Sequence, residues 1–176
     1  DDIDGNAGPG QATTDHPSPD YISVAASTTD GTLASGRLNV TAPAPISPTL
    51  QDIAYSMAGF GPGLAPGGIY PYGYIPAATV DLANATGCLP FAPGSFTGKA
   101  ALIIRGGCEF GVKVLNAENA GAVFALVYNN LAGGDALINM APGAVGNLVT
   151  IPSAFVGYTD GEALVSWYNL HTSSVE

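Results

Sequence analysis

Residues 98–130 constrain what this chain of 176 residues can fold into more than any other stretch. The run AALIIR at 100–105 is apolar up to its last residue and is followed by two glycines, as in a strand buried on both faces. Residues 109–121 then change to the spacing of an amphipathic helix, and AVFALVY at 122–128 is a second apolar run. A strand, a helix and a strand in this order predict a right-handed βαβ unit with parallel strands.

The predicted helix has one apolar face. Phe110, Val114 and Ala117 follow one another at steps of four and three residues, whereas Lys113 falls outside this face. Glu109 lies four residues before Lys113, which is the order that favours an ion pair along a helix. We therefore expect Lys113 among the polar residues of this helix, with Glu109 as its partner.

The rest of the chain predicts shorter elements that are separated by turns. Glycine and proline, 24 and 14 residues in all, are dense at 42–76 and predict irregular loops there. Thr159 and Glu162 are spaced as a capping box that begins a last helix, which would bury Leu164, Trp167 and Tyr168. Further strands are predicted at 21–28, 36–41, within 50–57, at 74–80 and at 149–157.

Composition excludes several classes of protein. Four Lys and Arg residues against 14 Asp and Glu residues leave a formal charge of −10, so the chain lacks the basic surface that binds nucleic acid or anionic lipid. A hydrophobic fraction of 47% argues against disorder, and a charged fraction of 10% argues against a coiled coil. No stretch approaches the roughly 18 uninterrupted apolar residues of a membrane span. We expect a compact, loop-rich domain that contains β-strands.

Cys88 and Cys108 are the only cysteines. Without a nearby histidine cluster they cannot complete a four-ligand zinc site, so a disulfide between them is the better interpretation. Closing a loop of about 20 residues would stabilise the fold by about 3 kcal/mol, and it implies secretion or another oxidising compartment. Sequons at Asn39 and Asn84 are compatible with secretion. The N-terminal sequence DDIDGNAGPG does not resemble a signal peptide, which is expected of a mature or excised chain.

Three patterns imitate catalytic or ligand sites. His16 stands next to an aspartate and near a serine, but close neighbours in a turn cannot adopt the geometry of a catalytic triad. The acidic start of the chain lacks the spacing and the bidentate Glu of a calcium loop. Gly106 and Gly107 precede a helix, but the G-x-G-x-x-G pattern is absent and Glu109 would repel phosphate. We therefore expect neither a metal nor a cofactor.

Three tyrosines alternate along the chain. Tyr70, Tyr72 and Tyr74 would share one face if this stretch is extended. Packing in the core or between strands is one interpretation. An exposed aromatic strip for recognition is the other, because Pro71 and Gly73 weaken a strand. The sequence leaves both open.

Two blocks carry a resemblance to a known family. GKAALIIRGGCEFGVKVLNAENAGAVFALVYNN at 98–130 is followed by IPSAFVGYTDGEALVSW at 151–167. The strand ending in Arg-Gly-Gly-Cys-x-Phe, the helix ending in Asn-Ala-x-x-Ala-Gly-Ala and the strand ending in Tyr-Asn-Asn resemble the protease-associated (PA) domain. The resemblance covers residues 45–170 and implies a small β-barrel or sandwich with flanking helices and no catalytic residues of its own. Cys88 also stands where many members keep a cysteine partner for the one in the Arg-Gly-Gly-Cys turn.

A second resemblance concerns the N-terminal part. GNAGPG at 5–10 and TTDHPSPDYISVAAST at 13–28 are similar to the stretch of subtilisin-like serine proteases around their oxyanion-hole asparagine. By this match Asn6 is the oxyanion candidate, and in that family a PA domain is commonly inserted between this stretch and the catalytic serine. The acidic residues 1–4 replace the usual apolar strand, and no His-Gly-Thr, catalytic Asp or Gly-Thr-Ser-Met motif occurs. The chain alone is therefore not expected to be an enzyme, although its parent protein is expected to be a subtilisin-like serine endopeptidase.

The two resemblances imply an N-terminal subtilase-like segment, 1–44, and a PA domain, 45–176. The implied fold class is α+β, PA-domain-like, with one βαβ unit. The implied function is non-catalytic: the domain binds protein or peptide surfaces, or controls the access of large substrates to the active site of a secreted, extracellular protease. The alternatives are a structural or dimerisation module of the parent protease, and a receptor-type domain that binds cargo.

The expected partners are a protein or peptide substrate and the rest of the protease chain, with no nucleic acid and no membrane insertion. The candidate binding residues lie in loops that a rigid scaffold displays and in the tyrosine strip. They are Gly106, Gly107, Glu109, Asn129, Asn130, Tyr70, Tyr72 and Tyr74.

Overall fold

The computed structural model describes residues 32–64 and 70–171. The description below concerns the unit Gly31–Glu176, into which contacts within the chain group the described residues. Asn6, His16 and the strand predicted at 21–28 lie outside the described residues.

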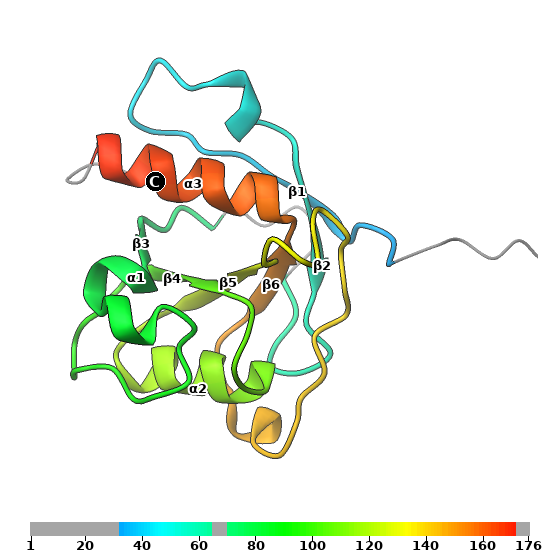
Figure 1. Cartoon of the computed structure of the whole chain (residues 1–176), viewed down its shortest axis with the longest axis vertical. Coiled ribbons are helices and arrows are strands. Elements are labelled where there is room, and N and C mark those ends of the chain that lie inside the picture. The colour runs from blue at the N-terminus through cyan, green and yellow to red at the C-terminus, as the bar shows by residue number, and fades with distance from the viewer. Residues whose placement is uncertain (1–31, 65–69, 172–176) are drawn as a thin grey trace, which may run out of the picture. The chain divides into compact units, whose positions relative to one another are not determined.

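The described residues form six strands: β1 (Gly36–Leu38), β2 (Ile53–Met57), β3 (Tyr74–Pro76), β4 (Ala100–Ile104), β5 (Phe124–Tyr128) and β6 (Ser153–Val156). They form one mixed sheet in the order β1-β2-β6-β5-β4-β3 (Figure 1). The four strands β3 to β6 are parallel, whereas β2 is antiparallel to β6 and β1 is antiparallel to β2. Within the described part of the chain, β1 and β3 are therefore the edges of the sheet.

Helices flank this sheet, and the predicted α+β fold class is confirmed. None of the helices in the described ranges combines the length and the apolar character that crossing a membrane requires. The α-helices are α1 (Ala77–Val80), α2 (Phe110–Asn119) and α3 (Tyr158–Leu170), and the 3-10 helices are η1 (Pro48–Leu50), η2 (Leu82–Asn84) and η3 (Gly146–Leu148).

Residues 98–130 form the βαβ unit that their sequence predicts. The helix α2 connects β4 to β5, and these two strands are parallel with Leu102 opposite Leu126. Ala101 and Ile103 of β4 are 0% exposed, and Ala100 and Leu102 on the other face are also buried. A strand covered on both faces explains the continuous apolar run, because its first four side chains are buried and only Ile104 is partly exposed.

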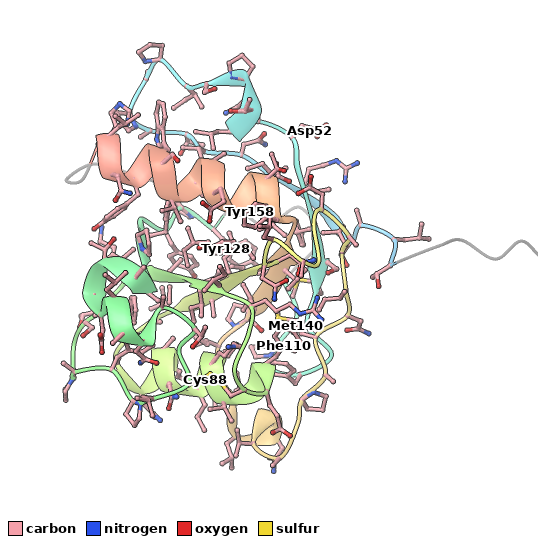
Figure 2. All side chains as sticks on the ribbon, in the orientation of Figure 1. Asp52, Cys88, Phe110, Tyr128, Met140 and Tyr158 are labelled. Atoms are coloured by element: carbon pink, nitrogen blue, oxygen red, sulfur yellow. A yellow bond between two sulfur atoms is a disulfide. The ribbon has the colours of Figure 1, made fainter. Side chains whose placement is uncertain are left out.

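Different helices cover the two faces of the sheet, with α3 on one side and α2 on the other (Figure 1). Since side chains alternate along a strand, Leu102 and Leu126 belong to the core cluster that includes Leu164 of α3. Ile103 and Val127 point the other way, into the two clusters that α2 completes. Figure 2 shows the same division between its labelled residues, because Tyr128 and Tyr158 lie near α3 whereas Phe110 and Met140 lie near α2.

The prediction of one strand at 74–80 is wrong in its second half, because these residues divide into β3 and the single-turn helix α1. Pro76 precedes α1 in an extended conformation, where its missing N–H is not needed. The strands predicted at 36–41, 50–57 and 149–157 form in part, as β1, β2 and β6. Pairing with a neighbouring strand sets their ends, and an apolar run does not reveal how far that pairing extends.

The helix α3 begins one residue before the predicted capping box. Its N-cap is Gly157, so Thr159 lies inside the first turn. Asp135, from the loop after β5, takes the capping role: its Oδ1 accepts the backbone N–H of Thr159 at 2.7 Å, and its Oδ2 accepts the Thr159 hydroxyl at 2.8 Å. Of the three side chains that this helix was predicted to bury, Leu164 is fully buried and the other two are half-buried.

Candidate functional site

A groove of about 710 Å³ lies on the α3 face of the sheet. Ala100, Leu126 and Ala154, from the neighbouring strands β4, β5 and β6, line it together with Leu164 of α3. All four residues also belong to the core cluster on this face. The groove is therefore an apolar opening that reaches the core beside α3, with a volume typical of ligand sites.

The two edges of the sheet flank this groove. Residues 35–41, which contain β1, line it on one side, and residues 70–72 with Tyr74, which lead into β3, line it as well. We call it the edge groove for this reason. An edge strand has backbone N–H and C=O groups on the side where no further strand lies, so the edge groove brings apolar lining together with a strand edge that no described strand pairs.

The three alternating tyrosines divide between core and groove. Tyr74 is buried, and its hydroxyl donates to the carbonyl oxygen of Leu164 at 2.7 Å. Burial and the neighbouring Tyr168 raise the pKa of Tyr74, so it stays neutral. Tyr70 and Tyr72 line the edge groove with their ring centroids 6.3 Å apart. Packing in the core therefore holds for Tyr74, whereas a role of Tyr70 and Tyr72 in recognition stays a prediction.

Phe124 of β5 extends the row of rings, with its centroid 6.4 Å from that of Tyr72. Tyr55 of β2 also lines the edge groove. Sequence reasoning did not single out either residue as part of a site. Both stand in strands, where an aromatic residue is the ordinary choice, so nothing in their own segments marks them.

The edge groove differs in charge from the chain as a whole. Among the described residues, its lining contains no Asp, Glu or Lys side chain, and Arg37 is the one charged residue. The Arg37 Nε lies 3.4 Å from Oδ1 of Asp52, and both side chains are well exposed. A chain with 14 acidic and four basic residues thus keeps carboxylates out of the lining of this groove.

The turn after β4 is fastened by the predicted disulfide. Cys88 and Cys108 are joined, with their Cα atoms 5.7 Å apart. Gly107 has a φ of +77°, and a Cβ added there would lie 3.0 Å from the Sγ atom of Cys88. Glycine is therefore required at this position both for its backbone conformation and for the approach of the disulfide. Gly106 and Gly107 shape the turn, and nothing in the structure tests them as binding residues.

Lys113 was predicted to lie on the polar side of its helix. This prediction is wrong, because the side chain lies against the disulfide turn. Its side chain is 0% exposed, and its Nζ donates to the backbone carbonyls of Thr86 and Gly106. Burial lowers the pKa of Lys113 to about 8. Glu109, its predicted partner, instead accepts the backbone N–H of Ala144 through Oε2 at 2.8 Å.

Asn129 organises the loop that follows β5. The side chain is 0% exposed, its Oδ1 accepts from Arg105 Nη1 at 3.0 Å, and its Nδ2 donates to the carbonyl of Ala136 at 3.0 Å. Asn130 likewise accepts the backbone N–H of Gly133 through Oδ1 at 2.9 Å. These bonds tie the ends of β4 and β5 to one loop, so the structure gives both asparagines a positioning role there.

Within residues 32–64 and 70–171, no group of three or more His, Cys, Asp or Glu side chains is placed to hold a metal ion.

The predicted binding residues do not form one cluster. The tyrosines lie at the edge groove, whereas Gly106, Gly107 and Glu109 lie at the disulfide turn and the asparagines in the loop after β5.

Comparison with known families identifies the fold. The family model described as the PA domain matches residues 68–164, which is more than half of the chain. The chain belongs to the PA domain family. The resemblance of 98–130 and 151–167 to this family is thereby confirmed.

Similar proteins include peptidases and ubiquitin ligases. "Probable leucine aminopeptidase 2" of Aspergillus fumigatus is 41% identical over 92 residues, which are 50% of this chain and 18% of that protein. "E3 ubiquitin-protein ligase RNF149" of Xenopus laevis is 43% identical over 61 residues, which are 35% of this chain and 15% of that protein. This chain thus matches less than a fifth of the length of either relative.

A solved structure of a zinc aminopeptidase from Bacillus subtilis, called BSAP, is also similar. It has a TM-score of 0.52 and 25% identity, and the match covers 73% of this chain and 29% of that one. The names of these three proteins do not identify a subtilisin-like protease, so the predicted parent class stays a prediction. What the comparisons establish is a PA domain of the kind found in peptidases and ligases.

Proposed function

We propose that this PA domain is a non-catalytic module of a secreted peptidase, where it binds polypeptide and controls the access of large substrates to the active site. The observation that carries the proposal is the edge groove: its described lining is apolar and free of carboxylates, and it lies beside a strand edge that no described strand pairs. Membership of the PA domain family and a relative named as an aminopeptidase support a peptidase as the parent protein.

The proposal requires that the chain by itself has no peptidase activity. Its sequence lacks the motifs that carry the nucleophile, base and orienting residue of a subtilisin-like protease, so we expect no acyl transfer by the chain alone. Purified chain incubated with fluorescently labelled casein is expected to release no fragments. Hydrolysis that a serine-protease inhibitor or a metal chelator abolishes would overturn this part of the proposal.

Deleting the domain from the parent protein tests the access role. If the domain guides large substrates, its deletion changes the kcat/KM for a folded or unfolded protein and leaves that for a short chromogenic peptide unchanged. If instead it is a structural or dimerisation module, deletion changes the mass in solution or the stability, and both substrates are affected alike. The second result would replace the access role with the structural one.

Two classes of peptidase are candidates for the parent protein, a subtilisin-like serine endopeptidase and a zinc aminopeptidase. Residues 5–28, with Asn6 as the oxyanion-hole candidate, favour a subtilisin-like serine endopeptidase, and residues 1–44 would then be its flanking piece. The aminopeptidase relatives favour a zinc aminopeptidase. The coding sequence downstream of residue 176 discriminates them, since a Gly-Thr-Ser-Met motif there belongs to the first class.

The disulfide favours an extracellular or other oxidising location for this chain, because thiols stay reduced in the cytosol.

Cargo binding by a membrane receptor is the second candidate function, and the ubiquitin ligase relatives are the observation that favours it. A membrane-spanning segment encoded in the parent gene would support that alternative over the peptidase.

A further inference from the structure

We propose that the edge groove binds an extended polypeptide segment that adds a strand to β1 and lays apolar side chains on the sheet face beneath it. The inference rests on the proposed function and names the site and the mode of binding that would serve it.

The free edge of β1 supplies the first part of the argument. β1 is paired with β2 on one side, and no described strand pairs with it on the other. An extended segment that lies along such an edge gains main-chain hydrogen bonds, which do not depend on its sequence. A domain that handles many different substrate chains needs this kind of sequence-tolerant contact.

The lining of the groove supplies the second part. Alternate side chains of an extended segment point to the same face, so those facing inward would meet Ala100 and Ala154. Alanine is small, and the volume of about 710 Å³ leaves room for apolar side chains above these two residues. Tyr72 and Phe124 offer ring surface at the same place. The groove therefore favours apolar or aromatic side chains at every second residue of the segment.

Charge decides which segments fit best. The described part of the lining has no carboxylate to pair with a basic side chain, and Arg37 is the one charged residue in it. The Asp52 carboxylate that pairs with Arg37 is 80% exposed, so this pair is readily exchanged for another carboxylate. The preferred segment is thus apolar with an acidic group toward Arg37.

The net charge of the chain disfavours a second copy of this chain as the occupant of the groove. Each copy carries a formal charge of −10, so two copies repel one another. A short apolar segment with a single carboxylate brings far less negative charge to the groove.

The test uses the chain of 176 residues and a dansyl-labelled heptapeptide. In this peptide threonine alternates with valine and a central phenylalanine, and the last residue is glutamate. Fluorescence anisotropy gives its Kd for the wild-type chain, for Tyr72→Ala, and for the matched control Tyr158→Ala. Tyr158 is also a half-buried tyrosine, but it does not line the groove. A second peptide, N-methylated at alternate residues, cannot pair as a strand and remains informative if Tyr72→Ala does not fold.

We expect Tyr72→Ala and N-methylation each to raise the Kd about tenfold or more, and Tyr158→Ala to leave it within about twofold. Replacing the terminal glutamate by lysine should also raise the Kd. Equal binding by wild type and Tyr72→Ala, or equal binding of the two peptides, would overturn the inference. A dimer in sedimentation that Tyr72→Ala dissociates would also overturn it, because the occupant would then be a second copy.

Binding of unfolded casein to the same variants separates this inference from the proposed function. If casein binds wild type and Tyr72→Ala equally, polypeptide binding stands and the edge groove is not its site. The deletion experiment in the parent protein decides the access role independently of either result.

Discussion

Lys113 lies in the first half of α2, yet its side chain is fully buried and its ammonium group donates to the carbonyls of Thr86 and Gly106. Burying a charge is costly unless polar partners replace water, and the two carbonyls do so here. They belong to turns that flank the disulfide, so Lys113 links α2 to both of these turns. The positively charged Lys113 side chain is therefore buried in the interior of the domain, although it belongs to a helix with an exposed side.

This burial predicts a pH dependence. The pKa of Lys113 is about 8 in the folded chain and about 10.5 in the unfolded chain, so between these values the unfolded chain holds more protons. The free energy of unfolding of wild type, relative to Lys113→Met, should therefore rise as the pH increases from 8 to about 10.5. Below pH 8 the lysine is charged in both states and the difference should be constant.

Urea unfolding of the two proteins at closely spaced pH values measures this difference. Other groups that titrate in the same window, such as tyrosines, are common to both proteins and cancel. Two curves that stay parallel across the window would show that Lys113 has an ordinary pKa in the folded chain.

Among the secondary-structure elements, α3 depends on a distant loop, because a residue of that loop caps its first turn. Asp135 lies in the loop after β5 and accepts both the N–H and the hydroxyl of Thr159. A carboxylate at a helix N-terminus also interacts favourably with the helix dipole. The start of α3 thus depends on the loop that Asn129 holds in place.

We expect Asp135→Ala to lower the free energy of unfolding by about 1 kcal/mol, as the loss of an N-cap does. Thr159→Ala is the matched control, because it removes the hydroxyl bond and keeps the bond from the backbone N–H. Its effect should be clearly smaller. Chemical unfolding followed by circular dichroism gives both values, and equal losses would mean that the backbone bond contributes nothing.

At the scale of the described molecule, one sheet separates two faces and the disulfide fastens one end of β4. Cys88 precedes β4 and Cys108 follows it, so the bond closes a loop of the chain around that central strand. Such a bond stabilises mainly by restricting the unfolded chain.

We expect the double variant Cys88→Ala with Cys108→Ala to lose about 3 kcal/mol of unfolding free energy. Reduction of wild type by a phosphine should cause a similar loss, and the double variant should be insensitive to the reductant. Thermal and urea unfolding with and without reductant provide the comparison. A wild type that reduction does not destabilise would contradict the assignment of stability to this bond.

The elements whose signal is local could be predicted from the amino-acid sequence. The buried strands around α2 and the pairing of the only two cysteines follow from runs and counts that lie within one segment. The family also follows from motifs in these segments. Local physics sufficed here because a βαβ unit completes its pairing within about 30 residues.

The features that need partners from distant segments became visible in the folded chain alone. Lys113 was buried by carbonyls outside its helix, α3 was capped by Asp135, and the strand predicted at 74–80 ended at Pro76. The edge groove joins residues 35–41, residues 70–74 and the faces of three central strands. Periodicity records which side of an element is apolar, but it does not record which other element comes to lie against that side. The candidate binding site therefore arises where segments from both sheet edges line one groove, which no single stretch of the sequence contains.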